Sequence, residues 1–87
     1  MKKLVQVTEV ENEGLDGLMG ERVTLFCLNY IYTGKLEGVN DQYVKLIDAS
    51  IVYETGELNT KTWKDAQALP KPVYVMTRCI ESFMILK

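Results

Sequence analysis

Two glycines inside one strand-like segment constrain the fold of this chain more than any other feature of the sequence. Segment 31–39 carries Gly34 and Gly38 at the same parity as the apolar residues Tyr32 and Leu36. Glycine inside a strand usually marks a sharp bend or a close approach of two backbones, because it has no side chain to keep them apart. A small barrel needs such bends, so the segment predicts a curved β-structure; the alternative is a pair of ordinary bulges.

The segments on either side of this one also predict strands. Residues 23–28 alternate between two faces, and residues 43–53 are rich in Val, Ile and Tyr. A turn is expected at residues 29–30 and a polar turn at residues 40–42, because Asn and Asp favour reversals. Residues 21–53 therefore predict three consecutive antiparallel strands.

The N-terminal segment, residues 1–20, predicts only a little regular structure. A weak strand signal at residues 4–7 is followed by an acidic stretch with apolar residues at roughly helical spacing. Three glycines interrupt that stretch, and each costs up to about 1 kcal/mol in a helix interior. A short helix of one or two turns is therefore expected.

The second half of the chain divides into a long connection and two last strands. Residues 54–72 are rich in Gly, Asn, Thr and Lys, and a helical turn is expected at 64–68 before two prolines. The last part, 73–87, holds two short apolar runs at 73–76 and 83–86. Strands this short and apolar need cover on both faces or a partner along an edge.

Composition limits the chain to one small domain, residues 1–87, and limits its chemistry. The net charge is −2 and the pI near 5.0, which does not favour indiscriminate binding to polyanions. Cys27 and Cys79 lie in apolar runs without a signal peptide ahead of them, which indicates reduced core thiols in a cytoplasmic protein. No apolar stretch approaches the roughly 18 residues of a membrane-spanning helix.

An enzyme is not expected. The chain has no histidine, which removes His-based acid–base catalysis and the commonest transition-metal ligand. Two cysteines alone supply half of a tetrahedral zinc site, and the sequence has no glycine-rich loop for phosphate. We therefore expect no catalytic residues, no metal and no cofactor.

The stretch GKLEGVND, residues 34–41, resembles the first signature of the Sm-like (LSm) family. In that signature a glycine, an apolar residue two positions later and an acidic residue six after the glycine bend the second strand into a polar loop. Residues 20–23 match the usual entry to the first strand, and residues 46–49 resemble the end of the third. The arginine of the second signature is retained as Arg78.

This resemblance implies a mostly β fold: a small, strongly bent, five-stranded open barrel of the Sm-like or SH3-like type, behind a short N-terminal helix. Sm-like subunits join into rings by pairing the fourth strand of one copy with the fifth strand of the next. The two apolar runs at 73–76 and 83–86 agree with such a use, so a homo-oligomeric ring is expected.

The resemblance also implies a partner, because family members bind single-stranded, commonly uridine-rich RNA at the ring pore; a role as a chaperone for RNA pairing is the expectation for this chain. They use the loop between strands two and three together with the arginine of the second signature. In an ungapped register Asn40, Gln42 and Val44 occupy the acidic, stacking and base-reading positions. A one-residue bulge would place Asp41, Tyr43 and Lys45 there instead. The candidate RNA-binding residues are Asn40, Asp41, Gln42, Tyr43, Lys45 and Arg78.

Each candidate also has a purely structural interpretation. Asn40 and Asp41 are typical turn residues. Tyr43 can be a partly buried strand tyrosine, and Lys45 can be a solvated residue on the outer face of its strand. Arg78 has the alternative of an intersubunit salt bridge to Glu81 or Asp41. A scaffold ring without RNA recognition is the alternative function.

Trp63 is the remaining aromatic residue of interest, because Lys61, Lys64 and Lys71 lie near it in the sequence. This pattern is compatible with a second nucleic-acid surface. Tryptophan in a loop more often packs down to anchor that loop, which is the interpretation we favour.

Overall fold

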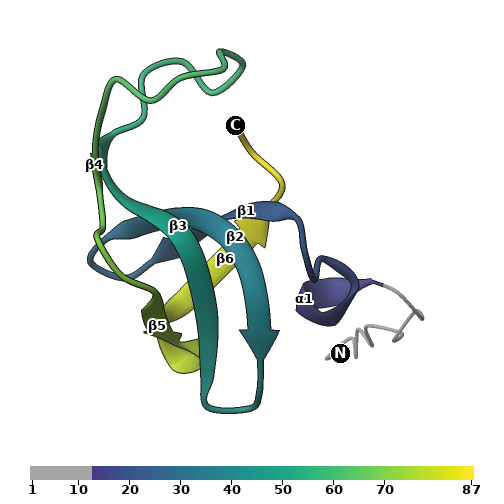
Figure 1. The fold of residues 1–87 in the computed structure, drawn as a ribbon. Helices are drawn as coiled ribbons and strands as arrows, with labels where there is room; N and C mark the ends of the chain where they lie inside the picture. The colour runs from purple at the N-terminus through teal and green to yellow at the C-terminus, as the bar shows by residue number, and fades with distance from the viewer. Residues whose placement is uncertain (1–12) are drawn as a thin grey trace, which may run out of the picture.

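An antiparallel sheet of six strands makes up most of the computed structural model, which describes residues 13–87 (Figure 1). A short N-terminal helix precedes the sheet, so the mostly β class and the helix were predicted correctly. The strand signal at 4–7 lies outside the described residues. In chain order the elements are α1 (Gly14–Gly17), β1 (Arg22–Cys27), β2 (Ile31–Val39), β3 (Tyr43–Glu54), β4 (Asp65–Ala68), β5 (Val73–Met76), the 3-10 helix η1 (Thr77–Cys79) and β6 (Ile80–Met84).

The sheet has the order β4-β3-β2-β1-β6, and β5 pairs with β3 beside β4. All of these pairings are antiparallel. Between residues 13 and 87, no strand pairs with the outer edge of β5 or of β6. The sheet is therefore not closed, and both of these strands present a free edge.

Strand β3 bends in its middle and serves two partners along one edge. Its first half pairs with β5, from Tyr43 to Leu46, and its second half pairs with β4, from Ser50 to Glu54. Between the halves lies Asp48, whose φ of 48° falls in the left-handed region that few residues other than glycine adopt. Figure 1 shows the resulting curve of β3 from the β2–β3 turn towards β4.

Gly34 lies against this bend, as its place in the sequence predicted. A Cβ atom on Gly34 would come within 3.0 Å of the Cα and Cβ atoms of Ala49 and of the carbonyl oxygen of Ile47. Only glycine permits the two backbones to approach so closely. A Cβ on Gly38 would meet only Lys45 Cβ, at an ordinary 3.7 Å. Gly38 instead borders a one-residue bulge, where the pairing of β2 with β3 shifts between Leu36 and Gly38.

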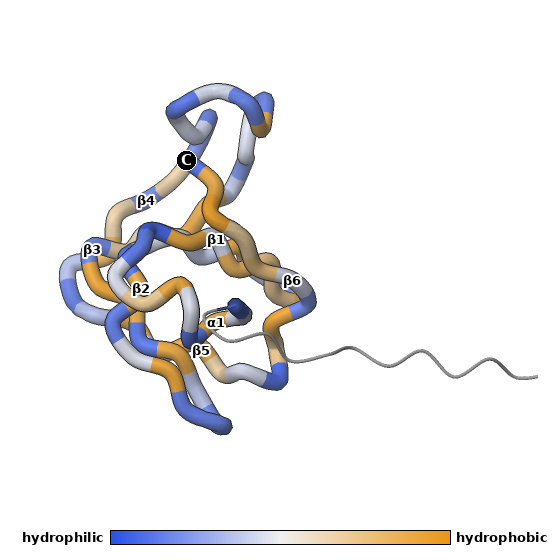
Figure 2. Tube along the Cα trace, turned by 90° about the vertical axis from the view of Figure 1, so that its right-hand side faces the viewer, coloured by the Kyte–Doolittle hydropathy of each residue, from blue (hydrophilic) through white to orange (hydrophobic). Residues whose placement is uncertain are grey.

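The hydrophobic core is formed by residues of β1, β2, β3 and β5, and Figure 2 shows hydrophilic residues concentrated in the β2–β3 turn and in the loop before β4. On β1, Val23, Thr24 and Leu25 are all fully buried, so both faces of this strand are covered. The hydroxyl of Thr33 donates to the carbonyl oxygen of Val23 at 3.1 Å, and the hydroxyl of Thr24 donates to that of Leu86 at 3.0 Å. The buried apolar residues are Val23, Leu25, Leu36, Val44, Leu46, Ala49, Val52 and Val75.

The second half of the chain differs from the prediction in two places. The expected helical turn at 64–68 is wrong, because residues 65–68 form β4 and raise the expected five strands to six. Every residue of β4 is exposed, so its pairing with the free edge of β3 overrides a sequence without strand character.

The last strand begins earlier than predicted. It covers Ile80–Met84 rather than residues 83–86, because η1 reverses the chain directly after β5 and brings Ile80 opposite Cys27. The polar Glu81 and Ser82 are exposed within this strand. Only Ile80 is partly buried and the other four residues of the strand are exposed, so pairing with β1, rather than a run of apolar residues, determines its position.

Candidate nucleic-acid interface

The turn between β2 and β3 is built around the side chain of Asn40. Its Oδ1 accepts hydrogen bonds from the backbone N–H groups of Gln42 and Tyr43, at 2.7 and 2.8 Å. The backbone N–H of Asn40 donates to the carbonyl oxygen of Tyr43 at 3.0 Å. Asn40 therefore acts as a turn residue, and its amide oxygen is engaged within its own loop.

This turn is also tied to η1, which carries Arg78. The Thr77 hydroxyl donates to the carbonyl oxygen of Asp41 at 2.9 Å, and the Thr77 backbone N–H donates to that of Gln42 at 3.0 Å. The loop and the arginine are thereby held together, although they are far apart in the sequence. The structure thus brings five of the six candidate residues, Asn40 to Tyr43 and Arg78, to one end of the sheet.

Arg78 is exposed beside this loop. In the described part of the chain its guanidinium makes no hydrogen bond or salt bridge, including to Glu81 or Asp41. Its five N–H donors are available to solvent or to an anion.

Tyr43 and Lys45 lie on the outer face of β3, since Val44 and Leu46 between and beyond them are buried. Tyr43 is 38% exposed, and its ring meets that of Tyr74 edge to face, with 5.3 Å between the centroids. Lys45 stands opposite Tyr74 in the pairing of β3 with β5, and its Nζ lies 6.0 Å from the centre of that ring. Gln42 is exposed in the turn itself.

Lys45 is not a free cation. Its Nζ lies 2.7 Å from Glu37 Oε1, and this hydrogen bond, together with the negative charge, raises the pKa of Lys45 above its ordinary value of 10.5. Glu37 reaches Lys45 because of the bulge in β2, where it is the extra residue between two paired positions.

Tyr74 was missed as a candidate, although the sequence held a signal for it. In residues 73–76 the alternation VYVM places Tyr74 and Met76 on the face opposite Val75. Val75 is buried in the structure, whereas Tyr74 is 56% and Met76 41% exposed.

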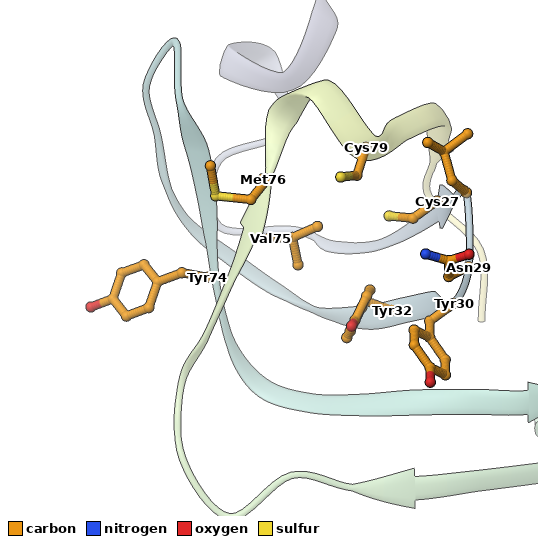
Figure 3. Close-up of a pocket in the computed structure, with 9 residues that line it drawn as sticks. Cys27, Asn29, Tyr30, Tyr32, Tyr74, Val75, Met76 and Cys79 are labelled. Carbon is orange, nitrogen blue, oxygen red and sulfur yellow. The ribbon is translucent and has the colours of Figure 1, made fainter.

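A pocket of about 180 Å³ lies on the other side of β5, between that strand and the end of β1 (Figure 3). Cys27 and Cys79 both line it, and the Tyr74 ring points away from them. Both cysteines are free, as predicted, but neither is fully buried: Cys27 packs against the edge of the core, and Cys79 is not among the residues that do so. Burial, aided by the nearby Cys79 and Glu81, raises the pKa of the Cys27 thiol above 9.0.

The described residues contain no helix long and apolar enough to cross a membrane. Nor, from residue 13 onwards, do three or more His, Cys, Asp or Glu side chains gather where they could hold a metal ion. Compared with known proteins, the chain matches no family model, no curated protein and no solved structure.

Proposed function

We propose that this protein is a ring-forming, Sm-like RNA-binding protein whose copies join edge to edge, β5 of one against β6 of the next. In this proposal the curved sheet serves as the strongly bent open barrel of that family. The observation that carries the proposal is that β5 and β6 each have a free edge, as β4 also does, since within residues 13–87 β5 pairs only with β3 and β6 only with β1. Unpaired backbone groups along a strand form a template for another strand.

Apolar side chains on both edge strands support this assembly. Tyr74 and Met76 on β5 are 56% and 41% exposed, and Met84 on β6 is 46% exposed. Phe83 on β6 is 36% exposed, and Ile85, directly after this strand, is 59% exposed. A domain of this size buries little surface by itself and gains from association. A head-to-tail contact between two different edges closes into a ring when the rotation per subunit fits.

Single-stranded RNA is the proposed partner, held at the pore by the loop around Asn40 and by η1, so that the ring acts as an RNA chaperone. Tyr43 offers an exposed ring on which a base can stack, a contact of about 1–3 kcal/mol that tolerates any base. Arg78 offers a guanidinium for phosphate. The bulge in β2 supports the register in which Asp41, Tyr43 and Lys45 take the family's three positions.

A scaffold ring without RNA recognition is the second candidate, and two observations favour it. Lys45 is neutralised locally by Glu37, and the amide oxygen of Asn40 is engaged in its own turn. Both groups are therefore less available to RNA than the sequence alone indicates.

Two measurements on the full chain test the proposal. Native mass spectrometry is expected to show one closed oligomer, and a monomer would contradict the ring. Fluorescence anisotropy with labelled oligo-U and oligo-A, at several salt concentrations, measures RNA binding. An intact ring that binds neither oligonucleotide at low salt would support the scaffold and exclude the RNA-binding role.

Matched variants locate the interface. Arg78→Ala should weaken binding and lower the salt slope by about 1, whereas Arg22→Ala, at the other arginine, should change neither. Tyr43→Ala should reduce affinity with little change in slope, and Tyr53→Ala, a similarly exposed tyrosine at the far end of β3, should have no effect.

A further inference from the structure

Residues 85–87, here called the C-terminal strap, leave β6 and run to the loop that joins β3 to β4 (Figure 1). The strap is fixed at two points. The hydroxyl of Thr24 donates to the carbonyl oxygen of Leu86 at 3.0 Å, and the side chain of Lys87 enters the loop formed by residues 55–64. The strap thereby connects β1 to a loop that is distant in the sequence.

Four groups of loop 55–64 surround the Lys87 ammonium, and we call them the ammonium cage. The carbonyl oxygens of Thr55 and Thr62 each accept a hydrogen bond from Nζ at 2.7 Å. The Thr60 hydroxyl oxygen lies 3.4 Å from Nζ. The centre of the Trp63 ring lies 4.4 Å from it. Lys87 thus reaches three oxygens and one aromatic face.

This arrangement matches the chemistry of a primary ammonium group. Such a group has three N–H donors and no acceptor, and the cage offers three oxygens. Hydrogen bonds from a charged donor are shorter and stronger than neutral ones, as the two contacts of 2.7 Å indicate. The indole face attracts the positive charge itself. A quaternary ammonium would keep the attraction to the ring but could make none of the hydrogen bonds.

The loop itself supplies every wall of the cage. Thr60 is held by a hydrogen bond from its hydroxyl to the carbonyl oxygen of Glu57 at 2.8 Å, and the Lys64 backbone N–H donates to the carbonyl oxygen of Thr55 at 3.4 Å. Lys87, by contrast, enters with a φ of 55°, which is uncommon for a residue with a side chain. The site therefore belongs to the loop, and the strap adopts an unfavourable backbone conformation to fill it.

We propose that loop 55–64 is a binding site for primary alkylammonium groups, filled by Lys87 of the same chain and open to competition from an external one. A lysine side chain of another protein and a free polyamine both present this chemistry. Displacement of Lys87 would release the strap from Thr24 and uncover the buried outer face of β1, next to β6. This proposal is independent of the proposed ring and of RNA binding.

The test uses the full chain and the fluorescence of Trp63, which is its single tryptophan. In Lys87→Met the cage is empty but the strap keeps an apolar side chain of similar length. Titration with n-butylammonium at constant ionic strength should give a saturable change in Trp63 emission. In the wild type and in the control Lys71→Met, Lys87 competes from the same chain, and the midpoint should be higher by about tenfold or more.

Three further ligands define the chemistry and its source. Tetramethylammonium, which lacks N–H donors, should give no saturable change. Cadaverine represents a free polyamine and Nα-acetyl-lysine methylamide represents a lysine side chain; saturation by either supports the site, and the tighter ligand identifies the source. No saturable response in folded Lys87→Met, equal midpoints in that variant and the wild type, or an equal response to tetramethylammonium would overturn the proposal.

A measurement on the wild type keeps the proposal testable if Lys87→Met does not fold, which circular dichroism would show. The methylene protons of Lys87 next to the ammonium should be shifted upfield in the NMR spectrum by the Trp63 ring current. Excess n-butylammonium should return them to the positions of a free lysine. Lys87 signals that coincide with those of free lysine from the start would show that the cage is not filled, and would overturn the proposal.

Discussion

The ammonium of Lys45 on β3 lies 2.7 Å from the carboxylate of Glu37 on β2, at the bulge that interrupts the regular pairing of these two strands. Both side chains are partly exposed, so the pair adds little to stability. Its importance is electrostatic, because the cation nearest to Tyr43 and Tyr74 on β3 is already neutralised. The balance of charge on this face therefore depends on Glu37.

Removing this carboxylate should strengthen RNA binding. Glu37→Gln frees the Lys45 ammonium for phosphate, so affinity for oligo-U should rise by about two- to fivefold. The salt slope should become steeper by about 1. Anisotropy titrations at several salt concentrations measure both quantities. Glu54→Gln is the matched control, since it also breaks an ion pair, with Lys64, but on the last residue of β3. Equal effects of the two variants would show that only net charge matters.

A charge on the free edge of β6 should break the proposed ring. Met84→Glu places a carboxylate among apolar side chains that the assembly would bury, so native mass spectrometry should show monomers. Met19→Glu is the matched control, because Met19 is 47% exposed and Met84 46%, and Met19 lies near α1 rather than on an edge strand. A ring that persists in Met84→Glu would exclude the β6 edge from the contact.

Gly34 should tolerate no side chain. In Gly34→Ala the new Cβ meets backbone atoms of Ile47 and Ala49 at 3.0 Å, so the free energy of unfolding should fall by about 1–3 kcal/mol. Gly38→Ala meets only Lys45 Cβ at 3.7 Å and should change stability by less than about 1 kcal/mol. Urea unfolding followed by circular dichroism compares the two. Similar losses in both variants would contradict the close approach at Ala49.

Cys27 should become reactive at a higher pH in the folded chain than an ordinary thiol does. Burial disfavours its thiolate and raises the pKa above 9.0, with Cys79 and Glu81 adding to the effect. Alkylation by iodoacetamide, measured by peptide mass spectrometry, should therefore reach half its maximal rate above pH 9.0 in the folded chain and at a lower pH in urea. Glu81→Gln should lower the folded midpoint.

The same shift has a consequence for stability. A pKa that is higher in the folded than in the unfolded chain stabilises the fold below pH 9.0, and this contribution is lost as the pH rises through the folded value. A folded alkylation midpoint at or below pH 9.0 would contradict this environment for Cys27.

Features that depend on local sterics were predictable from the sequence. Gly34 was identified because a glycine inside a strand has few uses other than a bend or a close approach. The turn around Asn40 followed from the preference of that residue for capping its own loop. The Asn40 turn acts within a few residues, and Gly34 marks the close approach by its own lack of a side chain, although its neighbour Ala49 lies on another strand.

Features that depend on the partner of a strand were not predictable. Residues 65–68 have no strand pattern and become β4 only because β3 offers an edge. The pairing of Lys45 with Glu37 requires the bulge, and the contact of Lys87 with Trp63 joins segments without a shared pattern. Five of the six candidate residues lie at one end of the sheet, whereas the charges that modify them could not be read from the sequence.

The position of β1 has a consequence for how the chain folds during its synthesis. This strand emerges early, yet one of its two neighbours is β6 and its outer face is covered through Leu86. A nascent chain on the ribosome would therefore expose one edge and one face of β1 until residues 80–86 have been released. Such long-range closure is slow compared with local pairing, so β1 is the strand of the β1–β3 unit whose hydrogen-bonding edge stays open the longest.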